Sequence, residues 1–183
     1  MSDTAQTPDR DAPPSRRRIV ISVDAMGGDA GPAAVVGGIN RVLKKNPDVS
    51  FLLHGPKADL KPLIQRKDRL RKNVEIRDAE RAVSMEDKPS QVMRNAKGTS
   101  MWSALESVRE REAEVVVSCG NTGALMMLSV VRLRKIPGVT RPAIAVLWPS
   151  RNPQGFNIML DAGADIRADE NDLLQYALMG ASY

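Results

Sequence analysis

Cysteine and histidine each occur once in this chain of 183 residues, as Cys119 and His54. A lone cysteine cannot close a disulfide within the chain, so nothing in the sequence indicates an oxidising compartment, and we expect a cytoplasmic location. The acidic, histidine and cysteine residues show no metal-ligand spacing, and the sequence therefore predicts no metal and no cofactor. A hydrolase triad would have to use His54, and a thiolate nucleophile would have to be Cys119, which we expect instead to be a small buried residue at a strand end.

Aromatic side chains are also scarce, at 3% of the residues, and long apolar runs are missing. The longest run falls well short of the ~20 residues that a membrane-spanning helix needs. Residues 41–97 are basic, with 15 Lys or Arg against 8 Asp or Glu, but Phe51 is their only aromatic residue. A nucleic-acid-binding module, which stacks bases on aromatic rings, is therefore disfavoured; a solvated surface and a docking surface for an acidic partner both stay open.

Short β-branched runs alternate with helical segments along the chain. Residues 1–18, rich in Pro, Asp, Ser and Arg, are expected to form a disordered tail ahead of one α/β domain over residues 19–183. The patterns predict strands at residues 19–24, 49–54, 73–78, 115–118, 143–148 and 157–161, and helices at 32–45, 57–72, 89–112, 124–135 and from 169 onward. Pro62 is expected in the first turn of its helix or at a kink, and Gly98 weakens the centre of another. This alternation predicts a doubly wound, mainly parallel sheet with helices on both faces, incomplete within this chain.

Two glycine-rich loops follow predicted strands. The first, DAMGGDAGP at residues 24–32, has an acid at the strand end and glycines that let a ligand approach the backbone. The second, SCGNTGA at residues 118–124, offers backbone N–H groups and the positive end of a helix dipole to an anion, with Asn121 and Thr122 as further donors. Neither loop has the spacing of a familiar nucleotide-binding motif, and an ordinary capped turn stays an open alternative for both.

A third segment, RNAKGTSMWSAL at residues 94–105, combines cations with hydroxyl groups. Arg94 and Lys97 are three residues apart, so they share one face if the helix is continuous there. Together with Thr99 and Ser100, Lys97 would suit an oxyanion or a phosphate. A solvated face is the commoner explanation of a lysine on a helix.

Taken together, these segments resemble the phosphate acyltransferases of the PlsX family. The resemblance covers residues 19–183 and rests on six motifs, which are, in chain order, D-A-M-G-G-D-x-x-P, K-x-x-S-M, V-S-x-G-N-T-G-A-L-M, R-P-A, L-D-x-G-A and L-L-Q-Y-A-x-M-G. It implies that the chain is the N-terminal part of a longer α/β enzyme, similar in fold to phosphotransacetylases and isocitrate dehydrogenases. It also implies that these 183 residues alone are weakly active or inactive.

The resemblance implies transfer of a fatty acyl group from acyl carrier protein to inorganic phosphate, which gives acyl phosphate for phospholipid synthesis. Phosphate would attack the thioester carbonyl directly, so the site must hold an anion and stabilise an oxyanion. The residues implied to be catalytic are Lys97, Asn121 and Ser100. Those implied to bind phosphate or substrate are Asp24, Gly27, Gly28, Asp29, Arg94, Thr99, Gly120, Thr122 and Gly123.

The partners that the same resemblance implies are acyl carrier protein, inorganic phosphate and a second copy of the chain, with no nucleic acid. It further implies peripheral association with the inner face of the membrane and with glycerol-3-phosphate acyltransferase. A coenzyme A-dependent phosphate acetyl or butyryl transferase of related fold is the rival enzyme. Residues 57–72, with seven Lys or Arg against two Asp, are expected to steer the acidic carrier protein.

Overall fold

A four-stranded parallel sheet is the centre of the computed structural model, which describes residues 18–161 and 168–182. Its strands are β1 (Val20–Asp24), β2 (Ser50–Gly55), β3 (Val74–Asp78) and β4 (Val115–Ser118), in the spatial order β3-β2-β1-β4. The chain runs outward from β1 to β3 and then crosses to the other side of β1, where β4 pairs with it. This reversal creates a topological switch point between the carboxyl ends of β1 and β4, where open α/β sheets bind their ligands.

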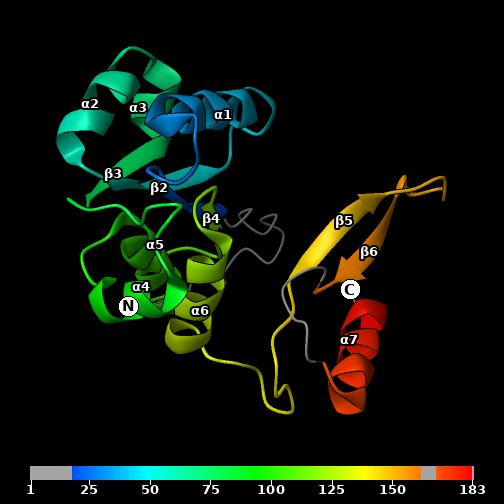
Figure 1. The fold of residues 1–183 in the computed structure, drawn as a ribbon. Helices are drawn as coiled ribbons and strands as arrows, with labels where there is room; N and C mark the ends of the chain where they lie inside the picture. The colour runs from blue at the N-terminus through cyan, green and yellow to red at the C-terminus, as the bar shows by residue number, and fades with distance from the viewer. Residues whose placement is uncertain (1–17, 162–167, 183) are drawn as a thin grey trace, which may run out of the picture.

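Helices cover both faces of this sheet, as the alternation of segments predicts, and the fold class is confirmed (Figure 1). One layer contains α1 (Gly31–Lys45), α2 (Lys57–Gln65) and α3 (Asp68–Asn73). The other layer contains α4 (Pro89–Asn95), α5 (Ser100–Arg109) and α6 (Thr122–Arg132). Each layer has its own apolar cluster. The first includes Val23, Ile39, Leu43, Leu53 and Leu60, and the second includes Val92, Met101, Leu105, Ala124 and Leu128.

Two of the predicted helices are broken, so the prediction of single helices over residues 57–72 and 89–112 is wrong. Gly98 has a φ of +86°, and Thr99 is extended, so the chain leaves α4 and starts α5 afresh. Arg94 and Lys97 therefore do not share one continuous helix face. Lys67 is also extended, which separates α2 from α3, and Pro62 lies inside α2 beyond its first turn.

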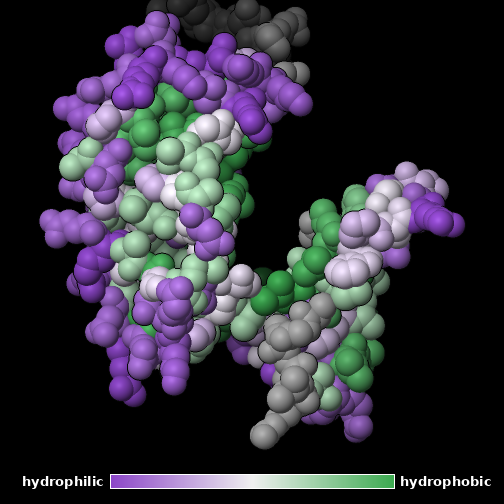
Figure 2. Space-filling view, turned by 45° about the horizontal axis from the view of Figure 1, so that its top comes forward, coloured by the Kyte–Doolittle hydropathy of each residue, from purple (hydrophilic) through white to green (hydrophobic). Residues whose placement is uncertain are grey.

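The last two strands do not join the main sheet. Instead β5 (Ala145–Pro149) and β6 (Phe156–Leu160) pair antiparallel as a separate hairpin, and α7 (Glu170–Ser182) packs beside β6 to form an arm (Figure 1). The connection between these strands is too short for the crossover that a parallel pair needs, so a hairpin is the available solution. Figure 2 shows apolar side chains uncovered on this arm, where Leu147, Trp148 and Leu174 are exposed.

Two further sequence predictions concern the ends of the chain and the membrane. The predicted tail over residues 1–18 lies, except for Arg18, outside the described residues. Among those that are described, no helix is both long enough and apolar enough to cross a membrane.

A buried polar network joins β1, β2 and α5. The hydroxyl of Ser22 donates to the carbonyl of Ala104 at 2.8 Å, and its Oγ lies 3.0 Å from Nε2 of His54. Nδ1 of His54 lies 2.8 Å from Oγ of Ser103. Because the proton of Ser22 is already directed to Ala104, His54 donates through Nε2, and in the neutral ring Nδ1 then accepts from the hydroxyl of Ser103. Burial and, to a smaller extent, the nearby Arg77 lower the pKa of His54 to about 4.

This network makes stability depend on pH. The unfolded chain protonates its histidine near pH 6.5, whereas native His54 resists protonation down to about pH 4. The free energy of unfolding should therefore fall by about 3 kcal/mol as the pH drops between those values, and this contribution should not change further below them. Urea unfolding across this range measures the slope, and His54→Gln, which cannot titrate, provides the reference. Equal slopes in the two proteins would contradict the assignment.

Candidate functional site

The loops that follow β1 and β4 are joined at the switch point by one hydrogen-bonded pair. The hydroxyl of Ser118, the last residue of β4, donates to Oδ2 of Asp24, the last residue of β1, at 2.8 Å. The same hydroxyl accepts from the N–H of Gly120 at 3.1 Å, and Oδ1 of Asp24 accepts from the N–H of Met26 at 3.2 Å. The buried carboxylate thus organises the backbone of both loops.

Backbone contact between the loops requires glycine at position 27. A Cβ atom on Gly27 would lie 2.5 Å from the backbone N of Gly120 and 2.9 Å from Oγ of Ser118. Neither neighbour can move aside cheaply, because one is main chain and the other holds Asp24. The structure therefore brings together Asp24, Gly27 and Gly120, which the sequence pattern placed in two separate loops.

Asn121 closes the second loop onto a distant part of the chain. Its Oδ1 accepts from the N–H of Ala124 at 3.0 Å, which caps α6. Its Nδ2 donates to the carbonyls of Ser84, Met85 and Asp87, at 3.3, 3.2 and 2.9 Å. Since these partners already occupy the side-chain amide, we expect Asn121 to position the loop rather than to contact a ligand through its side chain.

Several helix N-termini meet at this edge of the sheet. The N–H groups of Thr122 and Gly123 open α6 and have no hydrogen-bond partner among the described residues. The first turn of α5 also lies close, because Cε of Met101 is 3.2 Å from where a Cβ of Gly120 would be. The positive ends of these helices make the edge suitable for an anion. No group of three His, Cys, Asp or Glu residues in the described part of the chain could hold a metal ion.

An apolar groove of about 440 Å³ runs between α1 and the strands β1 and β4, and it reaches the two loops. Its walls include Val35, Ile39 and Phe51, while Gly28 and Asp29 lie at the end nearest the loops. Cys119 also lines this groove and is exposed, so the prediction of a buried cysteine is wrong. It occupies the turn just after β4, beside Gly28 of the other loop.

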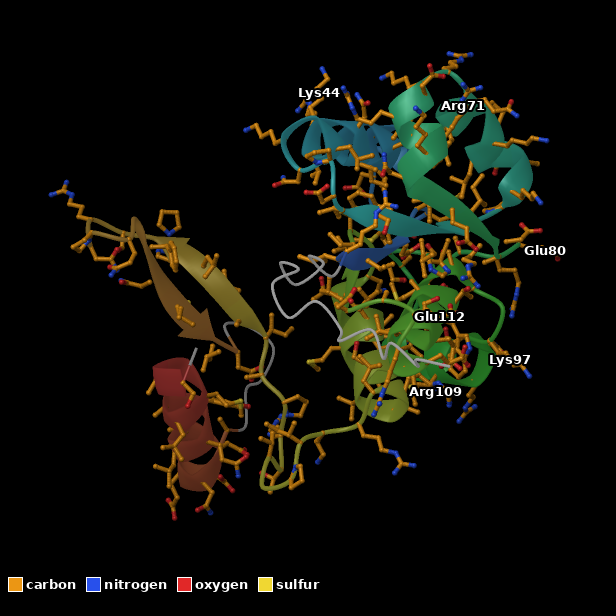
Figure 3. The ribbon with its side chains drawn as sticks, turned by 180° about the vertical axis from the view of Figure 1, so that it is seen from behind. Lys44, Arg71, Glu80, Lys97, Arg109 and Glu112 are labelled. Atoms are coloured by element: carbon orange, nitrogen blue, oxygen red, sulfur yellow. The ribbon has the colours of Figure 1, made fainter. Side chains whose placement is uncertain are left out.

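The predicted site residues near the α4–α5 turn differ in burial: two are buried and two are exposed. The hydroxyl of Thr99 caps α5 by accepting from the N–H of Trp102, and Ser100 is fully buried, with no partner for its Oγ in the described part of the chain. Arg94 and Lys97 are exposed, and Figure 3 shows Lys97 at the outer margin of the body. Lys97 does not line the apolar groove, so its predicted role in neutralising charge stays a prediction.

Two residues that help to hold the loops and the turn in place were not predicted from the sequence. Ser118 gave no signal of its own, because nothing in the sequence indicates that β4 pairs with β1. Arg81 lies in the irregular connection after β3, yet its carbonyl accepts from the N–H of Ser100 and its guanidinium donates to the carbonyl of Lys97. It therefore holds the turn that precedes α5.

Replacing Gly27 by alanine should destabilise the protein by about 1 to 3 kcal/mol, because the added methyl group forces the two loops apart. Gly37→Ala is the matched control: this glycine lies inside α1, and a Cβ there would meet nothing within 4 Å. The control should gain about 0.5 to 1 kcal/mol from the helix preference of alanine. Denaturant unfolding of both variants checks the pair, and two changes of the same sign would refute the contact.

A family model described as "Fatty acid synthesis protein" matches residues 19–183. A protein of Ruegeria sp. (strain TM1040) named "Phosphate acyltransferase" is 74% identical over 167 residues, which are 91% of this chain and 44% of that relative. Proteins of the same name from Roseobacter denitrificans and Paracoccus denitrificans are 63% and 66% identical, over 100% and 94% of this chain and 50% and 46% of the relatives. The chain thus spans about half the length of the curated relatives it matches.

Proposed function

Because the chain belongs to the fatty acid synthesis protein family, we propose that the complete protein transfers a fatty acyl group from acyl carrier protein to inorganic phosphate. The product is an acyl phosphate, which serves phospholipid synthesis. The name "Phosphate acyltransferase" of the relatives supports transfer to phosphate. The acyl carrier protein as donor rests on the motif resemblance.

One observation supports this proposal most directly: the edge of the sheet that suits an anion lies at the end of the apolar groove. The loops that Gly27 and Gly120 bring into contact lie beside the first turn of α6, whose N–H groups have no partner among the described residues. The adjoining groove, lined by Val35, Ile39 and Phe51, suits an aliphatic chain. A reaction that joins phosphate to a fatty acyl group needs both environments next to one another.

The chemistry then follows from desolvation and positioning. A phosphate oxygen attacks the thioester carbonyl carbon, a new C–O bond forms, and the carbonyl oxygen becomes an oxyanion. When the tetrahedral species collapses, the C–S bond breaks and the carrier thiolate leaves, to be protonated from water. The N–H groups of Thr122 and Gly123 would stabilise the anionic oxygens of phosphate or of the oxyanion. Lys97 and Ser100 remain proposed contributors from the α4–α5 turn.

A basic surface on the first helical layer supports an acidic macromolecular donor. Lys44 at the end of α1 and Arg71 in α3 lie at the same end of the body (Figure 3), where Figure 2 shows hydrophilic side chains gathered. Arg66, Lys67 and Arg69 are exposed in the same layer. Such a surface raises the rate of encounter with an acidic partner more than it strengthens the final complex.

The homodimer, the cytoplasmic location and the peripheral association with membrane and glycerol-3-phosphate acyltransferase are proposals that rest on the resemblance alone. The exposed Leu147, Trp148 and Leu174 of the arm are the apolar surface that such contacts could bury. A coenzyme A-dependent short-chain transferase is the alternative that the following assay separates.

The full-length protein should form acyl phosphate when it is incubated with long-chain acyl carrier protein and phosphate. Hydroxylamine traps this product as a hydroxamate, and omission of phosphate is the control. Acetyl or butyryl coenzyme A should give far less hydroxamate than the long-chain carrier substrate. Hydroxamate from the short-chain coenzyme A donors only would replace the proposed function by the alternative, and no phosphate-dependent product from any donor would refute both.

Reversal of Arg66, Lys67 and Arg69 to glutamate should raise KM for acyl carrier protein about tenfold at low ionic strength, because steering is lost. The value of kcat should not change, since these residues lie in α3 and in the link between α2 and α3, away from the glycine loops. At high salt the difference from the unmodified protein should shrink, because screening removes steering from both. Identical KM values of the variant and the unmodified protein at low salt would show that this surface does not steer the carrier protein.

A further inference from the structure

A second, polar cavity of about 370 Å³ lies between the β3–α4 connection and α4. Two arginines line it: Arg81 from the connection and Arg94 from the last turn of α4. Gln91 and Asn95 add amide groups, and Asp87 adds a carboxylate. This cavity shares no lining residue with the apolar groove, so the proposed function above does not use it.

Arg81 is held in place from two directions. Its backbone forms a parallel bridge with Thr99, and its carbonyl accepts from the N–H of Ser100 at 2.8 Å. Its guanidinium donates one N–H to the carbonyl of Lys97. A guanidinium has five N–H donors, and the others of Arg81 have no partner within residues 18–161 and 168–182, so they can bind a ligand while this hydrogen bond holds the side chain in place.

Arg94 brings a second positive charge to the same cavity. It forms no ion pair and no hydrogen bond through its side chain among the described residues. The one acid of the cavity, Asp87, is partly engaged, because its Oδ2 accepts from the N–H of Ser84 at 2.9 Å. The two arginines therefore leave the cavity with a net positive charge, and phosphate oxygens are a preferred partner of such guanidinium pairs.

The rest of the cavity is too large and too varied for a phosphate ion alone. Its floor is apolar, formed by Val83, Val92 and Ala96, which belong to the core of the second helical layer. Gln91 and Asn95 at its rim can each donate and accept hydrogen bonds, as an amide or hydroxyl of a ligand requires. The lining thus matches a phosphate ester that carries an aliphatic tail with amide groups.

We propose that this cavity binds the phosphate ester of a pantetheine arm, with Arg81 and Arg94 on the phosphate. The proposal rests on the proposed function, in which the acyl donor carries such an arm. The cavity is linked directly to the glycine loops, since Nδ2 of Asn121 donates to the carbonyl of Asp87 and Pro89 packs against Gly123. An arm anchored by its phosphate in this cavity would have the neighbouring loops for its thioester end.

Calorimetric titration of the full-length protein with 4′-phosphopantetheine and with pantetheine, which lacks the phosphate, tests the proposal. Arg94→Gln should weaken binding of 4′-phosphopantetheine about tenfold, the scale of one charge-assisted hydrogen bond, and leave binding of pantetheine unchanged. Arg151→Gln removes the same charge from an exposed position outside the cavity and should change neither affinity. Arg94 is exposed, so its replacement should leave the fold intact, which circular dichroism verifies.

Equal affinities of the Arg94→Gln and unmodified proteins for 4′-phosphopantetheine would overturn the proposal. Inorganic phosphate that binds as tightly as the ester, with the same dependence on Arg94, would also overturn it, because the tail would then contribute nothing. The test is separable from the proposed function, since binding needs no turnover. A protein that forms acyl phosphate but binds the ester independently of Arg94 refutes this inference alone, and one that binds through Arg94 but forms no acyl phosphate refutes the function alone.

Discussion

The close approach of Gly27 to Gly120 is the constraint on which the geometry of the site depends. It sets the distance between the loop after β1 and the loop after β4, and the hydrogen bond from Ser118 to Asp24 keeps the two strand ends in register. With the loops at this distance, α1 and α6 both start beside the same edge of the sheet. The backbone donors of that edge are then preorganised before any ligand arrives, which is the condition for effective stabilisation of developing charge.

Asn121 extends the same organisation to the second helical layer. One side chain caps α6 and holds three carbonyls of the connection that leads into α4. Asp87, one of those three residues, also lines the cavity of Arg81 and Arg94. The apolar groove, the glycine loops and the polar cavity are therefore mechanically connected through a few hydrogen bonds. A donor that has an acyl chain, a thioester and a phosphate ester, in that order, would meet the groove, the glycine loops and the polar cavity in the same order.

The alternation of strands and helices was enough to predict the parallel sheet, since β-branched runs and helical periods are local properties of the chain. The helix breaks at Lys67 and Gly98 were harder to predict, because either residue can also occur inside a continuous helix. The two glycine loops were recognisable from their composition. Which loops would touch was not, because the pairing of β1 with β4 is a long-range choice. For the same reason the sequence indicated neither the partner of Ser118 nor the occupied amide of Asn121.

Backbone amide shifts of the full-length protein, followed by NMR during titration with inorganic phosphate, test most directly that the joined loops hold the anion. The amides of Thr122 and Gly123, whose N–H groups have no partner among the described residues, should show saturable shifts, and the amides of Gly27, Gly28 and Gly120 in the adjoining loops should shift with them. Gly37, in the middle of α1 with open space around it, should not shift and serves as the internal reference. Saturable shifts elsewhere in the protein, with the loop amides unmoved at saturating phosphate, would contradict the central claim.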